Sequence, residues 1–169
     1  MQTCCQNCSD CSKNKHRSEE DKKNLIKRLN RVEGQIRGIN KMVEEGFYYT
    51  AGKIRNVPVS IGGTTWKPDL PIESIVKEEI DEILNKEIED VEKAIELLLY
   101  TMKKQIFIDG NKRTSVIYAN HYLISKGKGI IVIPAELTEE FKNLLIPYYE
   151  GKDEIEIKTF IKEKCYMSI

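Results

Sequence analysis

A short polar run separates two apolar helical patterns in the second half of the chain. It covers residues 109–113, with the sequence Asp-Gly-Asn-Lys-Arg, and follows an apolar stretch that ends near Phe107. Glycine and asparagine tolerate left-handed dihedrals, so we expect a tight turn that leads into a new helix. The first N–H groups of a helix lack helical partners and carry the positive end of its dipole. Such a turn is typical of a phosphate-binding site, to which Lys112 and Arg113 add charge.

Asp109 adds a hard carboxylate oxygen at the edge of the expected phosphate site. Mg²⁺ is usually held in proteins by one or two carboxylates together with substrate phosphates. We therefore expect Mg²⁺ together with a phosphate-bearing ligand at this turn. The pattern predicts nucleotide chemistry.

The stretch from Gln105 to Arg113 resembles the central motif of the Fic/Doc family, which reads His-x-Phe-x-Asp/Glu-Gly-Asn-Gly/Lys-Arg. The resemblance implies transfer of a nucleotide monophosphate (AMPylation), or in the Doc branch a phosphate, from a nucleoside triphosphate to a protein hydroxyl. It implies Mg²⁺ with ATP or another nucleoside triphosphate as ligands. It further implies that Asp109 ligates Mg²⁺, that the turn at Gly110 and Asn111 holds phosphate oxygens, and that Arg113 braces the transferring end. The positions that match, and that the resemblance assigns to the nucleotide, are Phe107, Gly110, Asn111, Lys112 and Arg113.

Two positions depart from the motif. Gln105 stands where the family has its histidine general base, and a neutral amide has no useful basicity near pH 7. Val116 stands where the family has a second arginine. Positioning and electrostatics carry most of phosphoryl transfer, so weak or altered activity is compatible with the sequence. The alternative is a Fic-fold module that binds a nucleotide or a protein and transfers nothing.

Two further residues near this motif have structural interpretations. His121 falls in the helix after the motif, where we expect a buried histidine with a satisfied hydrogen bond. In many Fic proteins, a helix with the motif Ser/Thr-x-x-x-Glu-Gly/Asn inhibits the activity, because its glutamate blocks productive binding of ATP. The nearest match begins at Thr159 and reaches Glu163, which Lys164 follows, so we interpret Glu163 as a surface residue and expect no such restraint.

Composition excludes several classes of protein. The 169 residues suit one domain with a short appendage, and 27 basic residues balance 27 acidic ones. A neutral chain has no general attraction to nucleic acid or anionic lipid, so we do not expect DNA as a partner. No apolar run approaches the roughly 18 residues of a membrane span, and no signal-peptide pattern begins the sequence. We expect a cytoplasmic protein without a membrane partner.

Residues 1–17 form a cysteine-rich leader. Cys5, Cys8 and Cys11 are spaced by two residues each, with Cys4 and His16 nearby. These soft ligands suit Zn²⁺ or Cu⁺, although structural zinc sites usually draw their second ligand pair from a separate turn. A flexible tail without a metal is the alternative, and the sequence favours neither.

Residues 18–46 predict a long amphipathic helix that begins at Ser18. Its apolar residues form a heptad seam, which must be buried against a partner and offers a route to self-association: Leu25, Leu29, Val32, Ile36, Ile39 and Val43. Gly34 and Gly38 lower the helix propensity, so we expect them to mark a close approach of another backbone.

The stretch Lys27 to Met42 resembles the first helix of the CsoR-type metal-sensing repressors. Members sense a metal through a cysteine shortly after this helix and a His-x-x-x-Cys pair on the next, and they bind DNA as helical tetramers. Here Tyr48 or Tyr49 occupies the first ligand position and the pair is absent. Arginines of the helix, such as Arg31, are of a type that contacts phosphates. A DNA-binding, metal-responsive regulator is thus a further alternative.

The remaining residues, 47–169, predict a mostly α-helical, Fic-like bundle with a β-hairpin flap, to which the N-terminal helix is added. The expected helices cover residues 71–84, 90–104, 114–126, 138–149 and 154–165, with a short extended segment at 130–133. Residues 54–61 and 64–66 read as two strands around a glycine turn. The resemblance implies that this flap docks the target protein, through Val59, Ser60, Ile61, Gly62 and Gly63. The alternative is a rigid connector with Trp66 buried.

Overall fold

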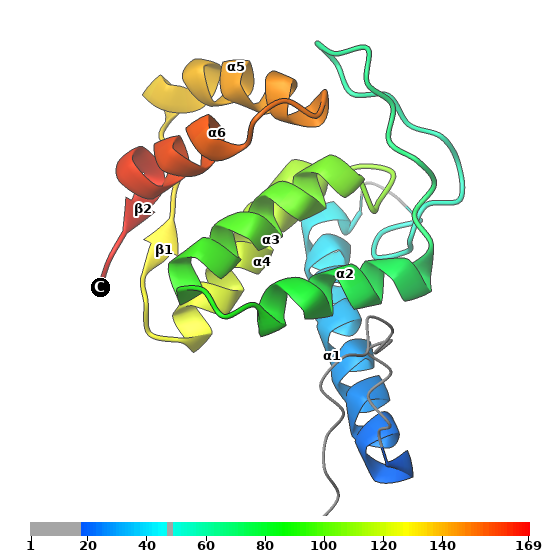
Figure 1. The fold of residues 1–169 in the computed structure, drawn as a ribbon. Coiled ribbons are helices and arrows are strands. Elements are labelled where there is room, and N and C mark those ends of the chain that lie inside the picture. The colour runs from blue at the N-terminus through cyan, green and yellow to red at the C-terminus, as the bar shows by residue number, and fades with distance from the viewer. Residues whose placement is uncertain (1–17, 47–48) are drawn as a thin grey trace, which may run out of the picture.

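The structure is a computed structural model, which describes residues 18–46 and 49–169. Within these residues the chain is mostly helical (Figure 1). The α-helices are α1 (Glu19–Glu44), α2 (Glu73–Asn85), α3 (Asp90–Lys104), α4 (Asn111–Ser125), α5 (Thr138–Tyr149) and α6 (Ile155–Phe160). A 3-10 turn, η1 (Ala135–Leu137), precedes α5, and a π turn, η2 (Ile161–Cys165), follows α6. The two short strands β1 (Ile130–Ile131) and β2 (Tyr166–Met167) pair antiparallel.

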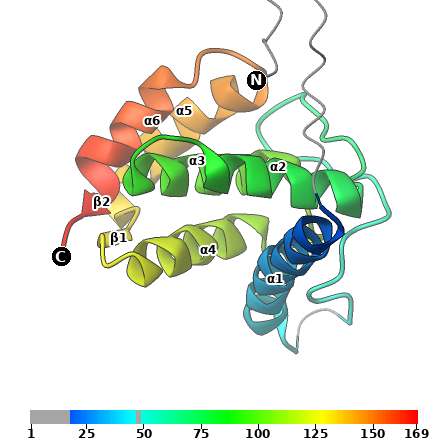
Figure 2. The ribbon, with the colours of Figure 1, turned by 60° about the horizontal axis from the view of Figure 1, so that its bottom comes forward.

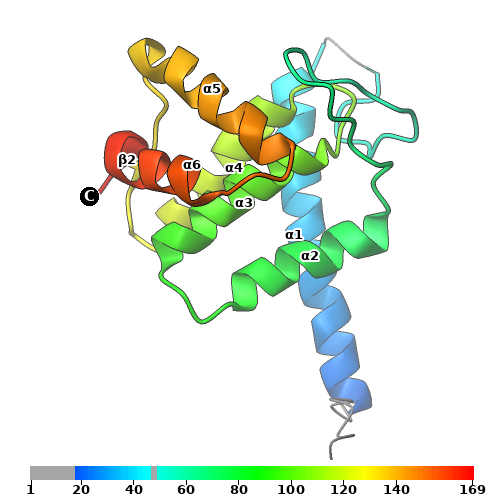
Figure 3. The ribbon, with the colours of Figure 1, turned by 45° about the horizontal axis from the view of Figure 1, so that its top comes forward.

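The antiparallel pair α3 and α4 forms the centre of the bundle. Helices α5 and α6 cover one side of this pair, and α1 crosses the other side next to α2 (Figure 2). The N-terminal half of α1 extends beyond the rest of the bundle (Figure 3). No helix of the described residues is both long and apolar enough to cross a membrane.

The apolar seam of α1 is buried inside the chain itself. Val32, Ile36 and Ile39 belong to one hydrophobic cluster with residues of α2, α3 and α4. Leu29 and Val43 are half-buried, and the side chain of Leu25 lies outside the described ones. The buried part of the seam is therefore not available to a second copy in this conformation. Self-association through the seam stays a prediction.

The glycines of α1 do not mark a close approach, so this expectation is wrong. A Cβ added at Gly34 or Gly38 would meet no atom within 4 Å. The tight packing occurs instead at Gly52, after the helix, where a Cβ would lie 2.8 Å from the carbonyl oxygen of Arg37. Both helical glycines lie on the exposed face of α1. A low helix propensity does not indicate whether another segment packs against that face.

Most of the predicted helices are present with small changes at their ends. The predictions for 90–104 and 138–149 are confirmed, whereas α4 begins at Asn111, three residues before the expected start at residue 114. The earlier start follows from Gly110, whose φ of 73° allows it to cap the helix directly. The last predicted helix, 154–165, instead changes from α6 into the π turn η2.

The predicted β-hairpin is wrong as secondary structure. Residues 54–66 contain no strand and form an irregular loop with a turn at Gly62 and Gly63. Pro58 removes one ladder donor. The buried guanidinium of Arg55 holds the loop instead, because it donates to the carbonyl oxygens of Gln105 (2.5 Å), Val57 (2.9 Å) and Asp69 (2.6 Å). Trp66 is half-buried and stacks on Tyr149 with ring centroids 5.7 Å apart.

We predict that Arg55→Met lowers the free energy of unfolding by roughly 3 kcal/mol, because three buried or half-buried carbonyl groups lose a charged donor. Chemical denaturation measures the change. Hydrogen exchange of residues 53–69 should accelerate at the same time. The exposed neighbour Lys53, replaced by Met, is the control. Equal stability of the two variants would show that the loop does not depend on the guanidinium.

Candidate functional site

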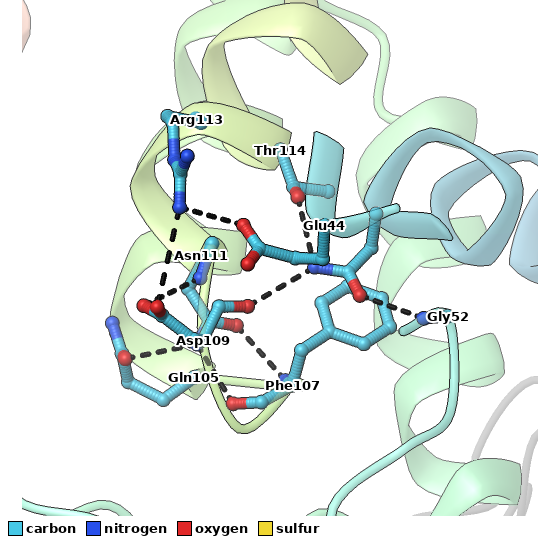
Figure 4. A network of polar contacts seen from close by, with 10 residues as sticks. Glu44, Gly52, Gln105, Phe107, Asp109, Asn111, Arg113 and Thr114 are labelled. Atoms are coloured by element: carbon cyan, nitrogen blue, oxygen red, sulfur yellow. Dashed lines mark hydrogen bonds and ion pairs between the residues drawn. The ribbon is translucent and has the colours of Figure 1, made fainter. Parts of the chain in front are cut away.

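The motif forms the connection between α3 and α4 (Figure 4). Gln105 follows α3 in the left-handed region, with φ 48°, which is uncommon for a residue other than glycine. Its Nε2 donates to the carbonyl oxygen of Met102 (2.6 Å), and its Oε1 accepts from Nδ2 of Asn111 (3.1 Å). The amide therefore joins the end of α3 to the start of α4. Neither end of it is a base.

Asn111 holds the turn closed through its side chain. Its Oδ1 accepts from the backbone N–H of Phe107 (2.9 Å), and its Nδ2 donates to the carbonyl oxygen of the same residue (2.8 Å). The side chain is only 6% exposed, so its part in the site is to shape the turn. The ring of Phe107 is 2% exposed and packs in the cluster that contains α1. It does not line the motif pocket, and its contact with a nucleotide stays a prediction.

The N-terminus of α4 offers unpaired backbone donors. The first bond of the helix runs from the N–H of Thr114 to the carbonyl oxygen of Gly110 (2.8 Å). The backbone N–H groups of Asn111, Lys112 and Arg113 therefore have no helical carbonyl oxygen to bond. Lys112 and Arg113 are exposed at this end. Both cations of the motif therefore lie at the start of α4.

These residues line one pocket of about 420 Å³, which we call the motif pocket. Its walls come from the α3–α4 turn and from the tip of the loop held by Arg55. The lining residues are Ser60, Ile61, Gly62, Gln105, Asp109, Gly110, Asn111, Lys112 and Arg113. Three of the five residues expected in the flap thus reach the pocket, whereas Val59 and Gly63 do not line it.

Sequence reasoning missed Glu44, the last residue of α1. Its Oε1 lies 2.6 Å from Nη2 of Arg113, and its side chain is 3% exposed, against 57% for that of Arg113. A buried carboxylate needs such a partner, because a charge left unpaired away from water is costly. Glu44 therefore occupies the guanidinium that was expected to face a phosphate. Glu163, the glutamate considered from the sequence, is exposed.

Asn40, one turn earlier on α1, was missed as well. Its Nδ2 donates to the carbonyl oxygen of Asp109 (3.1 Å) and to Oγ1 of Thr114 (3.1 Å), and its Oδ1 accepts from the N–H of Gly52 (2.8 Å). Asn40 and Glu44 follow Ile36 at four-residue intervals. They therefore continue the buried stripe of α1, and polar residues on such a stripe were the signal that could have revealed them.

The carboxylate of Asp109 suits a metal ion that a bound ligand also coordinates. One oxygen of Asp109 accepts from the N–H of Gly110 (2.7 Å), and the other lies 4.0 Å from Nη2 of Arg113 at the exposed rim. The described residues contain no group of three or more side chains that could hold a metal ion. A single carboxylate fits Mg²⁺ when phosphates supply further ligands. Cys5, Cys8 and Cys11 lie outside the described residues.

Comparison with known proteins gives one match. A family model described as a metal-sensitive transcriptional repressor matches residues 21–51, which cover α1 and the start of the following loop. No curated protein matches the chain. The matched segment includes Asn40 and Glu44, so the residues that contact the motif turn lie inside the repressor-like part of the sequence.

We predict that Glu44→Gln tightens binding of Mg²⁺–ATP by roughly tenfold, because Arg113 gains the freedom to contact phosphate with a charge-assisted hydrogen bond. Titration calorimetry gives the affinity. Glu45→Gln, on the exposed side of the same turn, is the matched control. Circular dichroism would verify that both variants are folded. If the two variants bind Mg²⁺–ATP equally, Glu44 does not limit access to Arg113.

Proposed function

We propose that the chain is a Fic-type transferase domain with low basal activity. It binds a nucleoside triphosphate with Mg²⁺ in the motif pocket and moves a nucleotide monophosphate, or a phosphate, to a hydroxyl of a target protein. The observation that carries this proposal is that Asp109, the free amides of α4, Lys112 and Arg113 line one pocket together. An anion there meets a helix dipole, two cations and a carboxylate suited to a bridging metal.

An adjoining pocket of about 520 Å³ supports a nucleotide rather than free phosphate. It shares Lys112 and Arg113 with the motif pocket, and its other walls are mostly apolar, including Val116, Phe141 and Leu145. A ligand with phosphates at the shared cations would place its base and sugar in this apolar space. Ligand sites of this size and lining are typical of small molecules.

The proposed transfer is an in-line displacement at phosphorus. In the AMPylation form, an oxygen of the target bonds to the α-phosphorus, and the bond from that phosphorus to the bridging oxygen breaks, so that pyrophosphate leaves. In the phosphate form, the γ-phosphorus is attacked and the nucleoside diphosphate leaves. Gln105 cannot take the hydroxyl proton, so the proton passes to the leaving group or to water. Mg²⁺, when bound, supplies charge neutralisation on the phosphates.

A non-catalytic binding module is the second candidate, and the bonds of Gln105 favour it. Its amide is used at both ends to join α3 to Asn111, which is a structural role. In this candidate the same pocket holds a nucleotide while nothing is transferred. The loop tip at Ser60 and Gly62 would then serve only to contact a partner.

A DNA-binding, metal-responsive regulator is the third candidate, and the match to residues 21–51 favours it. Two of the α1 arginines argue against it, since Arg28 pairs with Asp81 and Arg37 pairs with Glu33 in the same chain. A DNA complex in a gel-shift assay that changes with Cu⁺ or Zn²⁺ would support this candidate. A gel shift that does not change with either metal would exclude this candidate.

We predict that Mg²⁺–ATP at about 100 times its dissociation constant raises the melting temperature by roughly 5–10 °C, from the free energy of binding the native state. Asp109→Asn should remove the Mg²⁺-dependent part of this shift. Glu136→Gln, at an exposed position far along the chain, should leave the shift unchanged. A wild-type protein whose melting temperature does not respond to Mg²⁺–ATP would contradict both nucleotide candidates.

We predict that Gln105→His raises transfer from ATP to target hydroxyls, within the ~10²–10⁴-fold that general base catalysis contributes. Separate reactions with ATP labelled at the α or the γ position, with cell lysate as the source of targets, show which phosphate moves. Gln105→Met is the control, because it alters the same position without adding a base. No transfer by Gln105→His, with ATP binding intact, would favour the binding module.

A further inference from the structure

A second polar pocket lies between α1, the end of α2, the start of α3 and the C-terminal half of α4. Its volume is about 420 Å³, and it shares no residue with the motif pocket. We call it the basic pocket, because its lining contains Arg28, Arg31, Lys93 and Lys126 together with His121. No carboxylate is among the described residues that line it. His121 is exposed here, which corrects the expectation of a buried histidine.

The charges of the basic pocket are only partly compensated. Arg28 pairs with Asp81, and Lys93 donates to the carbonyl oxygen of Leu84 (3.3 Å). The ammonium group of Lys126 lies 5.7 Å from the ring centroid of Tyr122. Arg31 is exposed and has no ion pair within the described part of the chain. Arg31 and Lys126 thus line the hollow without an acidic partner among the described residues, and two cations that repel one another favour a bound anion between them.

The neighbouring tyrosines leave no additional negative charge in the basic pocket. The hydroxyl of Tyr122 donates to Asp90 (2.6 Å), whose carboxylate does not line the basic pocket. Burial raises the pKa of both Tyr118 and Tyr122, so their phenols stay neutral. The cations converge on one hollow from three helices, α1, α3 and α4, instead of forming a row along a surface. A compact polyanion fits this shape better than an extended nucleic-acid backbone, which needs a line of contacts.

We propose that the basic pocket is a second anion-binding site, which takes a diphosphate or triphosphate group. A phosphate chain carries several negative charges and many acceptor oxygens, which match guanidinium and ammonium donors. The ligand contacts Arg31 on α1 and Lys126 directly after α4, so it fastens α1 to the central helix pair. The source of the group is either a free polyphosphate or a nucleotide. This site does not depend on the transferase proposal.

Amide chemical shifts of the ¹⁵N-labelled full chain test the proposal in a titration with inorganic triphosphate, without Mg²⁺. We expect saturable shifts for residues 118–126 and for Arg31. Arg31→Gln with Lys126→Gln should weaken this binding by roughly tenfold or more, because two charge-assisted contacts are lost. The control pair is Lys27→Gln with Lys128→Gln, two exposed positions outside the pocket that remove the same charge. Equal weakening in both pairs, or no saturable shift at residues 118–126, would overturn the proposal.

A second arm separates this site from the motif pocket and identifies the source of the phosphate group. In Lys112→Gln with Arg113→Gln, the shifts at residues 118–126 should persist. The proposal would be overturned if the chemical-shift changes at residues 118–126 disappeared in this double variant. It would also be overturned if the changes occurred only at residues 110–113. Repeating the titration with ATP distinguishes the sources, since tighter binding than triphosphate supports a nucleotide and equal binding supports a free phosphate chain.

Discussion

The buried carboxylate of Glu44 connects the end of α1 to the start of α4, two segments that are far apart in the sequence. It ends the helix that matches a repressor family model, and its ion pair is with Arg113 in the first turn of α4. Breaking a buried pair by removing one partner costs on the order of 3–5 kcal/mol, because the remaining charge is left uncompensated. The exposed side of Arg113 reduces this cost here. Together with the bonds of Asn40, the pair fixes the end of α1 on the motif turn.

The motif turn keeps its shape without contributions from a catalytic base. Asn111 bonds both backbone groups of Phe107, and Gln105 bonds both α3 and Asn111. The phosphate-binding geometry that we propose therefore depends on amides and on a glycine, whereas the chemical step would depend on whichever group receives the proton. Binding and transfer are separable in this architecture. A chain can keep the first and lose the second through one substitution.

Local patterns predicted the helices well and contacts between distant residues poorly. The ends of α3 and α5 follow from apolar periodicity, and the convergence of residues 109–113 follows from a turn of known type. The loop around Arg55 could not be predicted in the same way, because β-branched residues favour strands while its partners come from three separate segments. The burial of Phe107 in the core could not be predicted either, because a motif position does not indicate which way a ring faces. Glu44 and Asn40 were missed because their partners lie about 70 residues away.

The glycine at position 110 couples two requirements in one residue. Its φ of 73° disfavours side chains, and a Cβ there would lie 2.2 Å from Oε1 of Glu44. A single added methyl group would therefore displace the Glu44 carboxylate, and with it the ion pair to Arg113. The absence of a side chain at position 110 sets how closely the end of the first helix can approach the turn.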